Sequence, residues 1–178
     1  MQKLPAVGQP PTSSRSGIAE SDSIEWDVME KFQNPSEEEI KSLLEHVRTI
    51  AVVGLSPQPN RPSHLVASNL QRFGYRIIPV WPAVETVLGE KAYAALREVP
   101  EKMDLVNVFR APQYVDAIVD DCIALGIKAI WLQDGVVNEP AALRAQAAGM
   151  TVVMDRCAYR DYVHFFGHAR RSGLSTPA

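Results

Sequence analysis

The chain has 178 residues, which is enough for one compact domain with a core and short for two. Its composition is ordinary for a globular protein, and a net charge of -3 gives no electrostatic reason to expect nucleic acid or an anionic membrane surface as a partner. No apolar run approaches the roughly 18–20 residues of a membrane span. Two cysteines, Cys122 and Cys157, are too few for a disulfide framework, so we expect a cytoplasmic protein.

The chain divides into a tail, one domain and a second short tail. Residues 1–33 are rich in proline, serine and glycine without apolar periodicity, so we expect a disordered N-terminal segment. The domain is expected over residues 34–168, with a flexible C-terminal tail over 169–178. A first helix is predicted with Asn34 as its N-cap, Pro35 at its first position and Glu37 completing a capping box.

After this helix, short apolar segments alternate with helical segments. The expected strands are 49–53, 75–80, 103–109, 127–132 and 150–154. The expected helices are 62–73, a short one after a loop within 88–99, and then 112–125, 138–148 and 159–166.

This alternation predicts an α/β protein of three layers. The fold class is a Rossmann-like, doubly wound, parallel five-stranded sheet covered by helices on both faces. Numbering the expected strands in chain order, we predict the order 3-2-1-4-5. A ligand would then lie at the carboxyl ends of the strands, between strands 1 and 4.

The loop after the first strand predicts an anion site. The strand breaks at Gly54-Leu55-Ser56, and a helix begins at Pro62 after a proline-rich turn. Free backbone N–H groups and the positive end of the helix dipole would face a ligand there. Arg61 and Ser63 at the helix start indicate that the anion is a phosphate.

Residues at the other strand ends complete the candidate site. The predicted ligand-contacting residues after strands 2 to 5 are Val80, Trp81, Pro82, Arg110, Gln133, Gly135 and Cys157. Cys157 follows Arg156, so it is either a reactive thiol or, as is commoner, a buried and inert one.

Several nucleotide sites and active sites are excluded by missing residues. The chain has no G-x-x-x-x-G-K-[ST] phosphate loop and no G-x-G-x-x-G fingerprint. Val80-Trp81-Pro82 stands where a dinucleotide domain places an acid for the ribose, which disfavours NAD. Gln58 replaces the second glycine of a G-x-S-x-G nucleophile elbow, and Ser56 has no evident base.

Together these segments resemble the stand-alone CoA-binding proteins, which are similar to the nucleotide-binding domain of the succinyl-CoA synthetase alpha subunit. The resemblance covers about residues 35–157. The segments that carry it are 51–56, 61–63, 74–75, 78–80, 104–110, 131–133 and 153–157. It implies a Rossmann-like fold with coenzyme A at the strand ends, and Trp81 stands where the family usually has asparagine.

The resemblance implies a CoA or acyl-CoA ligand and no particular reaction. The synthetases carry a second catalytic domain for which this chain has no room, so a binding protein is favoured over an enzyme. The alternatives are a small nicotinamide- or acyl-CoA-dependent enzyme and a regulatory module that reports CoA to a protein partner. No nucleic-acid, membrane or metal partner is expected, and the oligomeric state stays open.

Overall fold

The computed structural model describes residues 31–172, and its centre is a five-stranded sheet. All four strand pairs are parallel, in the order β2-β1-β5-β6-β7. The strands are β1 (Thr49–Val53), β2 (Arg76–Val80), β5 (Leu105–Val108), β6 (Ala129–Leu132) and β7 (Thr151–Met154). Nearly all their residues are buried, as a sheet covered on both faces requires. The predicted Rossmann-like fold class is confirmed.

The predicted strand order is wrong in one respect. The third strand, β5, lies between β1 and β6 rather than outside β2. All four β5 residues are buried, which suits a central position, and the Asp104 carboxylate just before it accepts hydrogen bonds from the amides of Arg48 and Thr49. The switch point of the sheet therefore falls between β1 and β5, not between β1 and β6.

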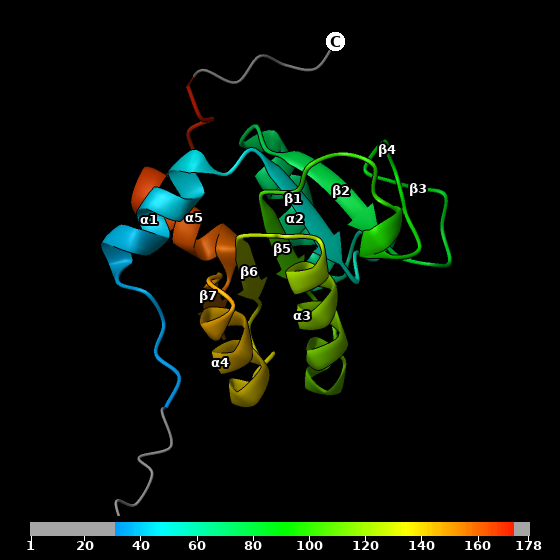
Figure 1. Ribbon diagram of the computed structural model, residues 1–178. Coiled ribbons are helices and arrows are strands. Elements are labelled where there is room, and N and C mark those ends of the chain that lie inside the picture. The colour runs from blue at the N-terminus through cyan, green and yellow to red at the C-terminus, as the bar shows by residue number, and fades with distance from the viewer. Residues whose placement is uncertain (1–30, 173–178) are drawn as a thin grey trace, which may run out of the picture.

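Helices cover both faces of the sheet (Figure 1). On one face, α3 (Val115–Ala124) and α4 (Glu139–Ala147) pack side by side over a core of aliphatic residues. On the other, α1 (Glu37–His46), α2 (Pro62–Arg72) and α5 (Ala158–Phe166) enclose a second core that contains Trp131. None of the helices in residues 31–172 is long and apolar enough to cross a membrane.

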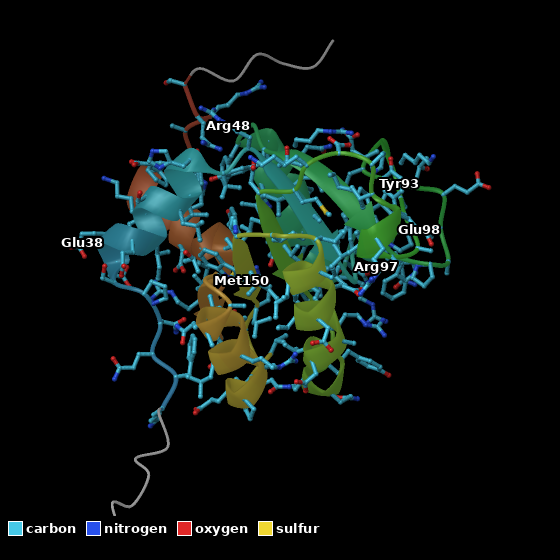
Figure 2. All side chains as sticks on the ribbon, in the orientation of Figure 1. Glu38, Arg48, Tyr93, Arg97, Glu98 and Met150 are labelled. Atoms are coloured by element: carbon cyan, nitrogen blue, oxygen red, sulfur yellow. The ribbon has the colours of Figure 1, made fainter. Side chains whose placement is uncertain are left out.

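The segment between β2 and β5 runs back along the outer edge of β2. It forms a hairpin of two-residue strands, β3 (Thr86–Val87) and β4 (Glu90–Lys91), and then the 3₁₀ turn η1 (Leu96–Glu98), where a short helix within 88–99 was predicted. Tyr93 lies against β2 (Figure 2) and exchanges backbone hydrogen bonds with Trp81 and Pro79. This segment occupies the edge where the predicted order would have put β5.

The N-terminal end of the described chain is fixed by specific contacts. The N-cap of α1 is Ser36 and the capping-box residue is Glu39, not Asn34 and Glu37 as predicted. Asn34 instead exchanges hydrogen bonds of 2.9 and 2.7 Å with the backbone of Met154, so it closes the edge of β7. Phe32 is buried in the core, although the tail was expected to extend to residue 33. The expected tail over residues 1–30 lies outside the described residues.

Candidate functional site

A crevice opens at the carboxyl ends of β1, β2 and β5. After β1 the chain crosses to α2 on one face, and after β5 it crosses to α3 on the other, so the two loops diverge. The cavity between them measures about 770 Å³. Six of the predicted site residues line it, namely Gly54, Ser56, Arg61, Ser63, Trp81 and Arg110.

Gly54 lets the two diverging loops approach each other. Its φ angle is +87°, a conformation that favours glycine. A Cβ atom there would lie 2.7 Å from the carbonyl oxygen of Phe109 and 3.1 Å from Cδ of Arg110. Its own amide donates to the carbonyl of Val80. A glycine is therefore required both by backbone conformation and by space.

The loop from Gly54 to Ser63 is braced by its own hydroxyls. The amide of Ser56 donates to Oγ of Ser63 at 3.0 Å, and the amide of Gln58 donates to Oγ of Ser56 at 3.2 Å. Nδ1 of His64 lies 3.0 Å from the carbonyl oxygen of Ser56. Ser63 is 5% exposed, so its hydroxyl is held beneath the loop. These bonds fix the loop before any ligand arrives.

The N-terminus of α2 points its unpaired donors at the crevice. Arg61 is the N-cap and makes no side-chain capping bond, and Pro62 at the first position has no N–H group. Within the described chain, no protein acceptor is found for the amides of Ser63 and His64. An uncapped helix start is a favourable place for an anion, because the helix dipole adds to the free N–H groups.

Arg110 sits between two aromatic rings at the mouth of the crevice. Its Cζ lies 4.5 Å from the centre of the Tyr114 ring and 5.8 Å from the centre of the Trp81 ring. Tyr114 belongs to the 3₁₀ turn η2 (Pro112–Tyr114) that precedes α3, whereas Trp81 follows β2. The crevice thus presents a guanidinium group and two flat aromatic surfaces.

The charge of the crevice is uniformly positive. Its lining residues include Arg61 and Arg110 but no aspartate or glutamate. Three other cavities of the described residues each include a carboxylate, from Glu38, Glu45 or Glu101. Arg76 and Arg156 form ion pairs with carboxylates elsewhere in the fold. Within residues 31–172, the Arg61 side chain instead donates only to the side-chain oxygen of Gln58, at 3.3 Å. The crevice is therefore suited to an anionic ligand.

Three predicted residues adjoin the crevice without lining it. Leu55 and Val80 are buried in the core, and Pro82 is exposed. Neighbours of Pro82, Ala83 and Val84, line the cavity instead. Leu55 and Val80 contribute to the site through the position of their backbone and not through their side chains.

The remaining three predicted residues lie outside the crevice. Gln133 is 3% exposed and donates to Oδ1 of Asn107 at 2.7 Å. The amide of Gly135 donates to the carboxylate of Asp155 at 2.7 Å. Cys157 is buried at the start of α5, and Arg156 is paired with Asp161 and Glu37. Gln133 and Gly135 were expected at the crevice because β6 was expected beside β1, and Cys157 was expected there because it follows the last strand; β5 takes the place beside β1 instead.

Sequence reasoning missed two aromatic residues of the site. Phe109 and Tyr114 line the crevice because β5 is central. Phe109 ends the expected strand 103–109, but only the next residue, Arg110, is among the predicted site residues. The signal that could have found both is their position just after the strand that borders the switch point.

A parallel sheet with a positive crevice at its switch point defines a Rossmann-like domain suited to phosphate-bearing ligands. The chain belongs to the family described as CoA binding domain, whose model matches residues 48–162. That match includes every crevice residue named above.

Individual relatives agree with this assignment. Uncharacterized protein YneT of Bacillus subtilis (strain 168) is 42% identical over 126 residues, which are 71% of this chain and 93% of YneT. A hypothetical protein from Pyrococcus horikoshii OT3 superposes with a TM-score of 0.73 at 33% identity, covering 78% of this chain and all of that one.

A second group of relatives consists of much longer proteins. The alpha subunit of acetate–CoA ligase [ADP-forming] II from Pyrococcus furiosus is 32% identical over 84 residues, which are 47% of this chain and 18% of that subunit. The chain therefore corresponds to a small part of such ligases.

Proposed function

We propose that the protein binds coenzyme A, free or acylated, in the crevice at the ends of β1, β2 and β5. The observation that carries the proposal is the pairing of two arginines with an uncapped helix N-terminus, in a cavity without a carboxylate. The diphosphate of CoA would lie on the loop from Gly54 to Ser63 and accept hydrogen bonds from the Ser63 and His64 amides.

The adenosine part would lie toward the end of β2. Trp81 offers a flat surface on which a purine can stack, and Tyr114 offers a second across the crevice. Arg110 lies between these rings and would contact a phosphate once a base takes its place. Arg61, on the opposite loop, is the residue we assign to the ribose 3′-phosphate.

The absence of a carboxylate from the described crevice lining favours CoA over a nicotinamide dinucleotide. Dinucleotide domains use an acidic residue after the second strand to hold the ribose hydroxyls. Here Trp81 follows β2, and no acidic residue lines the cavity. The longer relatives include an acetate–CoA ligase subunit, but the shared segment is too small a part of it to carry a ligase reaction to this chain.

Calorimetric titration of ligand-stripped protein with CoA, and separately with NAD, tests the proposal. We expect saturable binding of CoA and none of NAD. Binding of NAD alone would overturn the proposal and favour the oxidoreductase alternative. Turnover of an acyl-CoA in the same preparation would show that the protein is an enzyme rather than a binding protein.

A further inference from the structure

An amide pair lies buried just beyond the crevice, on the face of the sheet covered by α2 and α5. Asn107 is 0% exposed and Gln133 is 3% exposed. Asn107 is the third residue of β5, and its neighbours Val106 and Val108 face the opposite core, so strand alternation turns Asn107 toward the face that α1, α2 and α5 cover. Asn107 precedes the crevice residue Phe109 by two positions.

The hydrogen bonding of this pair is incomplete. Nε2 of Gln133 donates to Oδ1 of Asn107 at 2.7 Å. Nδ2 of Asn107 is buried and has no partner, and it is the only such side-chain atom among the described residues. No hydrogen bond to Oε1 of Gln133 is found either within residues 31–172. Nδ2 of Asn107 and Oε1 of Gln133 are thus one donor and one acceptor without a protein partner in the described chain.

The presence of one unpaired donor and one unpaired acceptor does not depend on which way the two side-chain amides are oriented. Exchanging nitrogen and oxygen in both side chains keeps the bond between them and again leaves one donor and one acceptor unpaired. Buried polar groups in folded proteins are almost always paired, because an unpaired one costs about 1–3 kcal/mol. The pair therefore offers a donor and an acceptor to a group that carries both a carbonyl and an N–H, such as a secondary amide.

The amide pair is within reach of the crevice. Phe109 follows Asn107 by two residues on the same face of the sheet, about 6.6 Å along the strand. Phe109 is only partly buried and lines the cavity. An extended arm that leaves the crevice beside Phe109 would come to Gln133 and then to the start of α5.

We propose that Asn107 and Gln133 form a subsite that binds a secondary amide of the ligand's arm. This inference rests on the proposed function, since CoA carries its thiol on an arm that contains two secondary amides. Asn107 would donate to the carbonyl of one amide, and Gln133 would accept from its N–H. The subsite would distinguish CoA from nucleotides that share its phosphates but have no arm.

The test compares CoA with adenosine 3′,5′-diphosphate, which lacks the arm. In the double variant N107L/Q133L both amides are replaced, so neither is left unpaired. We expect the affinity for CoA to fall about 10- to 30-fold and the affinity for adenosine 3′,5′-diphosphate to stay unchanged. The control N69L/Q146L makes the same replacements on α2 and α4, away from the crevice, and should bind both ligands as the wild type does.

A second measurement uses the wild-type protein and needs no variant to fold. The side-chain amide resonances of Asn107 and Gln133 should shift in nitrogen–proton NMR spectra when CoA is added, and not when adenosine 3′,5′-diphosphate is added. Unchanged CoA affinity in N107L/Q133L, or unshifted resonances at saturating CoA, would overturn the subsite while leaving the proposed function intact. Failure of the wild type to bind either ligand would overturn both.

Discussion

Gly54 and Phe109 approach each other more closely than any other residue type at position 54 would allow. A Cβ on Gly54 would lie 2.7 Å from the Phe109 carbonyl oxygen, and the φ angle of +87° is itself unfavourable for a side chain. The contact joins the ends of β1 and β5, where the sheet divides its connections between two faces. The close approach of these two loops at the crevice therefore requires that residue 54 have no Cβ atom.

Replacing Gly54 by alanine should affect both stability and binding. The left-handed conformation and the steric conflict together should lower the free energy of unfolding by about 2–4 kcal/mol and spread the loops that hold the ligand. Gly126→Ala is the matched control, because Gly126 has φ +68° and nothing within 4 Å of the added atom. Urea unfolding should show the larger loss for Gly54→Ala, and equal losses would contradict the role of the contact.

The fold class could be predicted from the sequence because it depends on local patterns. Apolar segments alternate with helical ones, and the loop from Gly54 to Ser63 joins a strand to a helix within a few residues. Gly54, Ser56, Arg61 and Ser63 of that loop line one cavity, whereas Leu55 is buried in the core. Arg110 was found as well, because the carboxyl end of any strand in the sheet faces the same edge.

The strand order could not be predicted in the same way. Both orders give parallel strands joined by right-handed crossovers, and both bury the same apolar segments. The choice is made by the segment 81–104, which returns along β2 through strands of only two residues. Such short strands leave no periodic signal, so Gln133, Gly135 and Cys157 were assigned to a crevice that β5 separates from them.

The capping box of α1 should contribute to the pH dependence of stability. The hydrogen bond that the Ser36 backbone amide donates to the Glu39 carboxylate holds the pKa of this carboxyl below its ordinary value. A lowered pKa in the folded state adds stability at pH values above the ordinary pKa, and this stability is lost as the pH falls through the folded value. Thermal melts at decreasing pH should therefore decline less steeply for Glu39→Gln than for the wild type. Glu38→Gln removes a charge from the same turn without a capping bond and should leave the wild-type slope.

Cys122 should be inert toward thiol reagents in the folded protein. Burial raises the pKa of its thiol to about 12, so almost no thiolate forms between about pH 7 and pH 8. Cys157 is also buried but is 8% exposed, against 0% for Cys122. Timed labelling with a thiol-reactive dye should modify Cys157 first and Cys122 only on unfolding. Rapid labelling of the folded Cys157→Ala variant would contradict this order.

Trp81 should contribute to the adenosine part of the site. Loss of a stacked aromatic ring costs about 0.5–1.5 kcal/mol beyond buried area, which corresponds to about a 2- to 13-fold loss of affinity. Trp81→Ala should weaken CoA and adenosine 3′,5′-diphosphate equally, because both carry the base. Trp81→Phe keeps a ring and should retain most of the affinity. If calorimetry gave the Trp81→Ala variant the same affinities as the wild type, the base would have to bind elsewhere.

Arg61 should recognise the ribose 3′-phosphate of CoA. It occupies the N-cap position of α2 at the mouth of the crevice, makes no side-chain capping bond and has no carboxylate partner among the described residues. A charge-assisted hydrogen bond contributes about 1.5–3 kcal/mol, so Arg61→Ala should weaken CoA by about 10- to 150-fold. Dephospho-CoA lacks the 3′-phosphate and should bind the variant and the wild type alike. Arg72→Ala removes the same charge from the exposed last turn of α2 and should leave both affinities unchanged. Equal losses for CoA and dephospho-CoA would assign Arg61 to the diphosphate instead, because the diphosphate is the charged group that the two ligands share.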